Sequence, residues 1–473
     1  MADVMKAPTP RGDSGVPNGG VSYWYTSTAL PKYRAPLPGD RDADVCIVGA
    51  GLTGLWAAYY LKRAQPDLRI VMLEREFAGF GASGRNGGWL SAELAGSRAL
   101  YAKTHGHQGV VDLLAAMRGA VDEVIAVADA EGIDADIAKD GLLHVARNRA
   151  QVECLQETIE YEKLWGATDE DVVPLTLAEL NSRVVVEGAK AGIFSPDCAR
   201  VQPAKLVQGL AAAVERLGVV IYEQTTVEAI ESGLVRTDRG VARAPIVLRC
   251  LEGFTAGIKG QRRGWLPMNS SMIVTDPLPG PVMAEIGWSG AEVLGDGAHA
   301  YMYAQRTVDN RIALGGRGIP YRFGSRTDVN GETQDWTINA LTTLLHDMFP
   351  AAANVPIAQA WCGVLGVPRD WCATVDLDHE TGLGTAGGYV GSGLTTTNLA
   401  GRTLADLVLR QDTELTRLPW VGRRVRPWEP EPLRWLGVQA MYTLYREADR
   451  RENTLDLAHT SKIARFANRV AGR

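Results

Sequence analysis

Glycines recur at a fixed spacing between predicted structural elements near residue 50. The run DVCIVGAG is short, β-branched and ends in glycine, which predicts a buried parallel strand. The next run, LTGLWAAYYLKRAQ, has helical periodicity, and RIVMLERE is a second apolar strand. Strand, turn, helix and strand follow one another within about thirty residues, which indicates a βαβ unit.

The glycines of this unit have the spacing of a dinucleotide-binding loop. Gly49 allows a tight turn, Gly51 lets a pyrophosphate approach the backbone, and Gly54 lets the helix pack against the strand. The helix N-terminus then faces the phosphates. Glu74 ends the second strand twenty residues after Gly54, where a carboxylate accepts hydrogen bonds from an adenosine ribose. The sequence therefore predicts a dinucleotide site, and Glu74 disfavours a 2′-phosphate.

Two further glycine-rich stretches follow. Residues 81–90 read GASGRNGGWL, with Arg85, Asn86 and Trp89 among four glycines. A flexible linker would not need these three side chains, so we interpret the stretch as backbone that closely approaches a large polar group. Residues 387–396 read GGYVGSGLTT and open a predicted helix, whose N-terminus carries partial positive charge. A purely structural β–α turn is the alternative for this last stretch.

Composition excludes several classes of protein. The 473 residues are 46% hydrophobic and 22% charged, as in ordinary globular proteins, and the net charge of −6 argues against a nucleic-acid binder. No apolar run is long enough to cross a bilayer, and we expect no secretory signal and a cytoplasmic location. Six scattered cysteines form no CxxC pair, and the nearby pair His105 and His107 lacks further ligands, so no metal site is predicted.

Four blocks of sequence carry a family resemblance. They are DVCIVGAGLTGLWAAYYL, VMLERE with GASGRNGG, RRGWLPMNSSMIVTDPL, and WCGVLGVPRDW through AGGYVGSGLTTTNLAGRTLADLVL. Together they resemble the D-amino-acid oxidase superfamily of FAD enzymes, with glycine and sarcosine oxidase-like and γ-glutamylputrescine oxidase-like members nearest in pattern. The resemblance implies an α/β fold: a Rossmann-type FAD-binding domain interleaved with an antiparallel-sheet α+β substrate domain, plus C-terminal helices.

The resemblance also implies the boundaries of the two domains, and composition indicates the character of the two ends of the chain. Residues 1–43 are an N-terminal arm that we expect to be partly disordered. The FAD-binding domain takes 44–97, 198–257 and 361–412, and the substrate domain takes 98–197 and 258–360. The tail, 413–473, is predicted to be helical. Because it contains many arginines and several tryptophans, the tail either packs on the body as a helical cap, which we favour, or binds an anionic membrane surface.

The residues expected to contact the cofactor come mainly from the three glycine-rich stretches. In the family the second stretch surrounds the ribityl phosphate and the flavin ring. Arg85 and Asn86 are therefore expected to donate hydrogen bonds to phosphate or flavin oxygens. Trp89 is expected either to form a wall on the substrate side or to pack in the hydrophobic core. The expected contacts are Gly49, Gly51, Leu52, Thr53, Gly54, Glu74, Arg75, Gly81, Ala82, Ser83, Arg85, Asn86, Gly87, Gly88, Trp89, Val227, Trp361, Gly363, Gly391, Gly393, Leu394, Thr395 and Thr396.

The implied reaction is FAD-dependent oxidation of a C–N bond in a small amine or amino acid. The amine becomes an imine, water releases a carbonyl compound, and O2 reoxidises the flavin to give H2O2. The candidate catalytic residues are Tyr301, Tyr303, Arg317 and Trp361, and Arg306 is a further pocket candidate. An arginine there would hold a substrate carboxylate, although a solvated surface position is the alternative for each arginine. The sequence specifies neither the amine nor the oligomeric state.

Two positions depart from the sarcosine oxidases. Their oxygen-activating lysine matches Ala313 here, so a dehydrogenase that passes electrons to a quinone or carrier is an alternative to an oxidase. Cys362 has the spacing of their flavin-bound cysteine but not its local sequence, so we expect FAD to be non-covalent, with a Cys362 thioether as the alternative. Two further alternatives are a flavin monooxygenase or NAD-linked reductase, and a non-catalytic flavoprotein.

Overall fold

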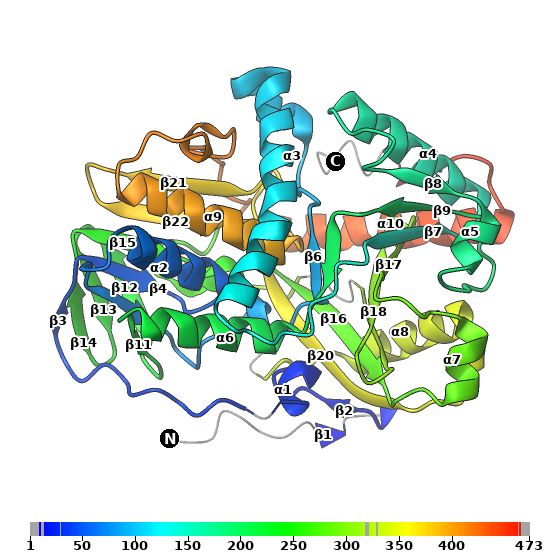
Figure 1. The fold of residues 1–473 in the computed structure, drawn as a ribbon, viewed down its shortest axis with the longest axis horizontal. Helices are drawn as coiled ribbons and strands as arrows, with labels where there is room; N and C mark the ends of the chain where they lie inside the picture. Colours follow the sequence, from blue (N-terminus) through cyan, green and yellow to red (C-terminus); the bar gives the residue numbers. More distant parts are fainter. Residues whose placement is uncertain are drawn as a thin grey trace.

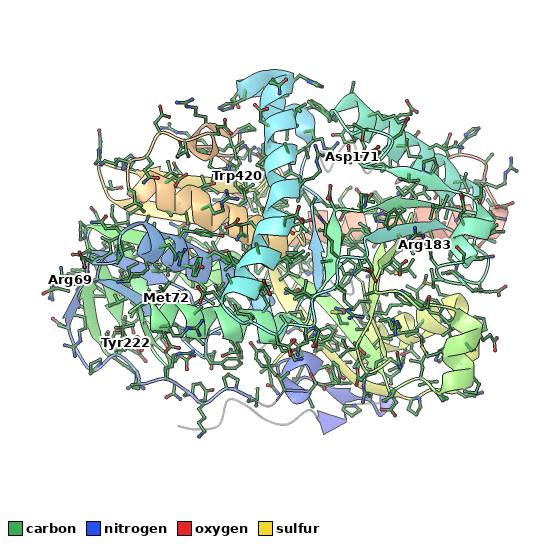
Figure 2. The ribbon with its side chains drawn as sticks, viewed as in Figure 1. Arg69, Met72, Asp171, Arg183, Tyr222 and Trp420 are labelled. Carbon is green, nitrogen blue, oxygen red and sulfur yellow. The ribbon has the colours of Figure 1, made fainter. Side chains whose placement is uncertain are left out.

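The computed structural model describes residues 9–10, 14–28, 30–316, 321–327, 330–461 and 463–464. Its elements gather around two large β-sheets, one on either side of the long helix α3 (Arg98–Ala130) in the view of Figure 1. Arg69, Met72 and Tyr222 lie in the half built on the six-stranded sheet, while Asp171 and Arg183 lie in the other half (Figure 2). The chain crosses between the two halves several times, so each sheet is assembled from separate segments.

The six-stranded sheet has the order β11-β5-β4-β15-β22-β21, and only β21 runs antiparallel to its neighbour. Because its strands are buried and parallel, they read as continuous apolar runs. The strands are β4 (Val45–Val48), β5 (Ile70–Leu73), β11 (Val220–Tyr222), β15 (Ile246–Arg249), β21 (Thr374–Asp378) and β22 (Leu383–Gly387). The surrounding helices include α2 (Leu52–Ala64), α6 (Pro203–Arg216) and α9 (Gly393–Val408).

The ten-stranded sheet has the order β1-β2-β20-β16-β19-β18-β17-β7-β9-β8, with a long antiparallel ladder between β16 and β20. Its strands are β1 (Thr9–Pro10), β2 (Pro17–Asn18), β7 (Leu142–Ala146), β8 (Val173–Leu175), β9 (Ala191–Ser195), β16 (Leu266–Thr275), β17 (Val293–Asp296), β18 (Met302–Arg306), β19 (Ile312–Gly316) and β20 (Ile357–Val367). The helices of this half are α1 (Tyr23–Thr26), α4 (Arg149–Leu164), α5 (Leu177–Asn181), α7 (Gly280–Ile286) and α8 (Asp335–Met348).

Smaller elements complete the described chain. One sheet pairs β6 (Trp89–Ser91) with β10 (Cys198–Arg200), and another contains β3 (Arg41–Asp42), β12 (Val227–Glu231), β13 (Leu234–Thr237) and β14 (Gly240–Arg243). Short 3-10 turns are η2 (Ala82–Gly84), η3 (Glu252–Gly257), η4 (Pro350–Ala352) and η5 (Leu415–Arg417), and the tail forms α10 (Leu433–Leu455). In the part of the chain that the structure describes, no helix is both long and apolar enough to span a membrane.

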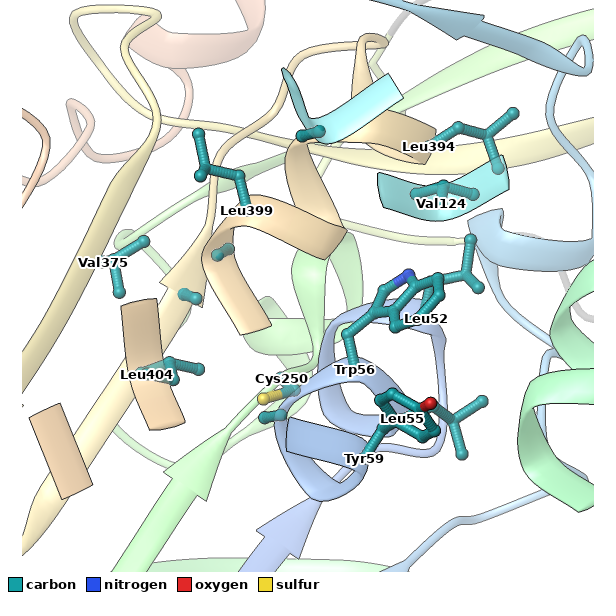
Figure 3. Close-up of a cluster of buried hydrophobic side chains, with 14 of the residues drawn as sticks. Leu52, Leu55, Trp56, Tyr59, Val124, Cys250, Val375, Leu394, Leu399 and Leu404 are labelled. Carbon is teal, nitrogen blue, oxygen red and sulfur yellow. The ribbon is translucent and has the colours of Figure 1, made fainter. Parts of the chain in front are cut away.

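The largest core cluster lies between α2, α9 and α3. It contains Leu52, Leu55 and Trp56 of α2 and Leu394 and Leu399 of α9 (Figure 3), together with apolar side chains from α3 and the six-stranded sheet. The two helices cross closely because a glycine occupies the contact: a methyl group at position 401 would lie 2.5 Å from Cβ of Trp56. Burial of this many apolar side chains is the main force that holds the two helices together.

The N-terminal arm crosses the molecule under the second glycine-rich stretch. Tyr23, Trp24 and Tyr25 are buried, and the indole of Trp24 donates to the Asn86 carbonyl at 2.8 Å. Ser22 and Tyr25 donate to the carbonyls of residues 84 and 79. The described part of the arm therefore supports the backbone of the 79–86 loop from one side.

The fold class expected from the sequence is confirmed, including the C-terminal helices and a second sheet that is mainly antiparallel, with β17–β7 and β2–β20 as parallel pairs. Most of residues 99–165 form α3 and α4, and pairing with β9 and β17 gives β7, which lies between these helices, a place in the sheet. The segment 361–367, which we assign to the FAD-binding domain, is the second half of β20, whose ladder with β16 extends to Val367.

Replacing Trp24 with alanine tests the role of the arm. Trp24 is 2% exposed and packs at 5.8 Å from Trp361, so the variant leaves a large cavity and an unpaired carbonyl. We expect Trp24→Ala to lower the free energy of unfolding, measured by urea denaturation, by about 3–5 kcal/mol. Trp336, which is 40% exposed, is the control, and Trp336→Ala should change the stability by at most about 0.5 kcal/mol. Equal losses in the two variants would contradict the bracing role.

Candidate cofactor and active site

A cavity lies at the carboxyl ends of the parallel strands of the six-stranded sheet, where open α/β sheets bind their ligands. All three glycine-rich stretches contribute to its wall. Of the residues predicted to contact the cofactor, those that line it are Gly49, Gly51, Leu52, Thr53, Glu74, Arg75, Gly81, Ala82, Ser83, Asn86, Val227, Gly391, Gly393 and Leu394. Sequence segments far apart in the chain thus meet around one elongated space.

The first glycine loop has the backbone that the motif predicts. Gly49 has a φ of +100°, which side chains rarely adopt, and a methyl group at Gly54 would overlap the carbonyl oxygen of Gly49. The half-buried Glu74 closes the loop: one carboxylate oxygen accepts the N–H of Ala50 at 3.0 Å, and the other accepts the N–H of Glu76 at 3.0 Å. Burial raises the pKa of Glu74. Glu74 also lines the cavity, as ribose recognition requires.

The second stretch is folded by its own polar groups. The amide of Asn86 donates to the carbonyls of Ala82 and Ser83 at 3.1 and 2.9 Å and accepts the N–H of Gly88 at 2.8 Å. The hydroxyl of Ser83 accepts the N–H of Leu52 at 2.9 Å, which joins this stretch to the first glycine loop. Asn86 therefore lies in the cavity wall, but its amide shapes the loop rather than extending toward a ligand.

Arg85 is placed differently from the sequence expectation. It does not line the cavity; it is 2% exposed, stacks at 4.3 Å over the ring of Phe80, and donates to the carbonyls of Phe80 and Cys362. The indole of Trp361 donates to the carbonyl of Arg85 at 2.9 Å. Because Cys362 belongs to β20, the guanidinium fastens the loop to this strand and does not contribute to the cavity wall.

Other predicted residues also lie outside the cofactor cavity. Trp361 is fully buried against the arm, Gly363 faces Arg85, and the thiol of Cys362 donates to the carbonyl of Glu332 at 3.2 Å. Three more predicted positions serve packing or helix geometry rather than lining the cavity; these are Gly54, Thr395 and Thr396. Gly87 and Gly88 contact strand β18, with the side chain of Gln305 donating to the Gly87 carbonyl at 2.7 Å.

The third stretch brings a helix N-terminus to the same cavity. Gly391 has a φ of +114° just before α9, and Gly393 and Leu394 of the first turn line the wall. A glycine cradle and two helix N-termini fit a dinucleotide such as FAD, because they provide close approach and partial positive charge.

A second, larger cavity adjoins the first, and Val390 lines both. Tyr301 and Trp89 belong to the wall of this larger cavity, and the phenol oxygen of Tyr301 would lie 3.7 Å from a methyl group placed on Gly391. The indole of Trp89 donates to the carbonyl of Ala304 at 3.1 Å, which fixes its ring. These two aromatic side chains therefore belong to the wall of the cavity that adjoins the cofactor cavity.

The remaining substrate candidates are elsewhere. Tyr303 lies against Gly87 and Gly315, with its hydroxyl 2.7 Å from that of Ser270. Arg306 donates to the carbonyls of Ser289 and Gly290 and does not reach either cavity. Arg317 lies outside the described residues.

Several acidic and basic residues in the two cavity walls were not found from the sequence. Among them, Glu252 lines the cofactor cavity, and Glu93, His144 and Asp296 line the larger one. Glu93 and His144 are 3.8 Å apart, and burial raises the pKa of Asp296 to about 6. Position in the sequence could have indicated two of them, because Asp296 ends a strand and Glu252 follows shortly after the end of one.

The cavity geometry makes the cofactor assignment testable with two substitutions. Gly51→Val places a branched side chain against Ser83, whose hydroxyl oxygen lies 2.9 Å from the position of a methyl group on Gly51, and Glu74→Ala removes the carboxylate from the wall. We expect both purified variants to be flavin-poor, measured as the 450 nm absorbance per polypeptide. Glu231→Ala, on an exposed position of β12, is the control and should retain flavin. Full flavin occupancy in both cavity variants would rule out the assignment.

Comparison with known proteins agrees with this geometry. The family model described as FAD dependent oxidoreductase matches residues 44–407. A probable oxidoreductase OrdL of Rhizobium meliloti is 29% identical over 414 residues, covering 84% of this chain and 90% of that protein. The γ-glutamylputrescine oxidoreductase of Escherichia coli is 29% identical over 378 residues, covering 78% of this chain and 84% of the relative.

Solved structures share the fold. Glycine oxidase from Geobacillus kaustophilus superimposes with a TM-score of 0.68 at 21% identity, covering 81% of this chain and 99% of that one. L-amino acid deaminase from Proteus myxofaciens superimposes with a TM-score of 0.66 at 16% identity, covering 83% and 95% of the two chains. With a family model matched across most of its length and with its glycine-rich cavity, this chain belongs to the FAD-dependent oxidoreductase family of D-amino-acid oxidase type.

Proposed function

We propose that this protein oxidises the C–N bond of a small amine or amino acid with FAD as the hydride acceptor. The observation that carries the proposal is that Val390 lines both cavities, while Tyr301 and Trp89 line the larger one. A substrate in the larger cavity would lie against the end of the cofactor cavity formed by Gly391 and Leu394. Similarity to relatives named for amine and amino-acid oxidation supports the same reaction class.

When bound, FAD supplies a two-electron acceptor. The substrate amine must arrive neutral, since its nitrogen lone pair has to stabilise the carbon that loses hydride. Loss of that hydride leaves an iminium, and water converts it to a carbonyl compound plus an amine or ammonia. In this scheme no protein base is required, so the contribution of the chain is to orient the substrate and exclude water from the junction.

Tyr301 and Trp89 are the residues assigned to orientation. The Trp89 ring is held by its bond to Ala304 and by an edge contact with Tyr303 at 6.1 Å, which makes it a rigid wall. The phenol oxygen of Tyr301 lies beside Gly391, and a phenol can both donate and accept hydrogen bonds. Glu93, His144 and Asp296 lie farther along the same wall and give the cavity ionisable groups that can bind a polar part of the substrate.

The electron acceptor and the flavin linkage form the finer part of the proposal. If O2 reoxidises the flavin, the product is H2O2. Ala313, which is buried in the cluster beside Trp361, supplies no cation for oxygen activation. This residue therefore favours the alternative, in which a quinone or carrier accepts the electrons. Cys362 is outside the cofactor cavity with its thiol bonded to a carbonyl, which favours non-covalent FAD.

The first experiment is anaerobic mixing of the purified flavoprotein with amines and amino acids. We expect at least one compound to bleach the 450 nm band, because hydride transfer reduces the flavin. Admission of O2 should then restore the band with formation of H2O2 if the protein is an oxidase, and an artificial quinone should restore it if the protein is a dehydrogenase. A spectrum unchanged by every amine and amino acid would count against the proposal, and bleaching by NAD(P)H alone would indicate a reductase or monooxygenase.

Tyr301→Phe tests substrate orientation. Removal of the hydroxyl leaves the ring and the cofactor wall in place, so we expect flavin content to stay at the wild-type level. The value of kcat/KM should fall by about 5- to 100-fold if the phenol hydrogen-bonds to the substrate or transition state. Tyr33→Phe, at a position 37% exposed, is the control and should leave kcat/KM unchanged. Unchanged kinetics in Tyr301→Phe would remove Tyr301 from the site.

A further inference from the structure

Glu252 is a carboxylate in the wall of the cofactor cavity to which the proposed reaction assigns no role. It follows strand β15 and opens the turn η3. Among the lining residues it is flanked in space by Val364, Leu365 and Tyr389, which come from β20 and from the loop before α9. Glu252 therefore lies where the two sheets and the third glycine-rich stretch meet.

The carboxylate joins its own turn to β20 and to the loop before α9. One oxygen accepts the N–H of Gly366 on β20 at 2.5 Å. The other accepts the N–H groups of Gly388 and Tyr389 at 2.8 and 3.0 Å. The distances between these donors and Glu252 are those of charge-assisted hydrogen bonds, which are stronger than bonds between neutral groups. Among the described residues, the donors at the Glu252 carboxylate are these backbone N–H groups, and no Lys, Arg or His forms an ion pair with it.

The local backbone is strained in favour of this arrangement. Glu252 has a φ of +44°, a left-handed conformation that residues with a side chain seldom adopt. Position 366 is glycine, and a methyl group there would overlap the Glu252 carboxylate. A strained residue with a fitted glycine partner at the edge of a binding cavity points to a functional constraint rather than to a tolerated surface position.

We propose that Glu252 is a positioning residue that fixes the loop before α9 on β20, and that its negative charge lowers the reduction potential of the bound flavin. The first part follows from the three N–H bonds, since Gly388 and Tyr389 lead directly into the cavity residues Val390 and Gly391. The second part follows from electrostatics. A carboxylate in the cavity wall repels the electron density that reduction adds to the flavin, and cofactor binding excludes the water that would screen it. The inference rests on FAD binding in the proposed function.

Glu252→Gln is the principal variant. The side chain keeps its shape, but its NH2 group faces backbone N–H donors and its charge is lost. We expect the Kd for FAD, measured by titrating the apoprotein, to rise about fivefold or more, because the loop must be ordered on binding without its anchor. At saturating FAD and pH 8.5, the midpoint potential of the flavin should shift to a more positive value than in the wild type. Burial raises the pKa of Glu252 to about 7, so the wild-type group is ionised at pH 8.5.

Two other variants separate this role from a general loss of stability. Glu292→Gln changes another buried carboxylate, which pairs with Arg183 away from both cavities, and it should leave the FAD affinity and the potential unchanged. Gly366→Ala keeps the charge of Glu252 but displaces the carboxylate, so it should weaken FAD binding as Glu252→Gln does. If Glu252→Gln does not fold, Gly366→Ala carries the test, and wild-type FAD affinity in that variant overturns the proposal.

The outcomes distinguish this inference from the proposed function. Wild-type protein that binds FAD and is reduced by an amine supports the proposed function whatever Glu252 does. In that case, an unchanged FAD affinity or an unchanged potential in Glu252→Gln overturns the inference alone. Failure of the wild-type protein to bind FAD overturns both.

Discussion

The close crossing of helices α2 and α9 is the constraint on which the cofactor cavity depends. Both helices begin at a glycine loop, and their apolar faces share one core. The absence of a side chain at Gly401 brings α9 against Trp56, and the hydroxyl of Thr53 lies 3.1 Å from that of Tyr389 across the two loops. Because the crossing fixes both helix N-termini at one cavity, their partial positive charges act on the same ligand.

A second layer of contacts holds the loop at residues 79–86 from behind. The arm contributes Trp24 and Tyr25, while β20 contributes the carbonyl that Arg85 binds and the indole of Trp361. The acceptors of these hydrogen bonds are backbone carbonyls, so the bonds fix the conformation of the backbone rather than that of a single side chain. The loop can therefore be rich in glycine and still keep a defined shape, since its conformational entropy is restricted by neighbours rather than by its own residues.

The two cavities use charged groups in different ways. Glu74 and Glu252, in the cofactor cavity, both accept backbone N–H groups and close turns between neighbouring segments. Glu93 and Asp296, in the larger cavity, lie in a wall that also contains aromatic rings and His144. The first arrangement suits a ligand held permanently in one position, and the second suits a substrate that enters, reacts and leaves.

The sequence alone determined the βαβ unit, the position of the glycine turns and the place of Glu74 in the cavity wall, because these depend on local periodicity and on the conformational freedom of glycine. It also placed Tyr301 and Trp89 among the candidates, although it gave no reason to prefer them over Tyr303. Only the tertiary structure decided the places of Arg85 and Glu252, since the partners of each come from distant strands. An arginine beside a phosphate-binding motif suggests an anion, yet here Arg85 is captured by carbonyls of Phe80 and Cys362. Sequence spacing specifies which backbone can turn, whereas the direction of a polar side chain depends on the donors and acceptors that folding brings beside it.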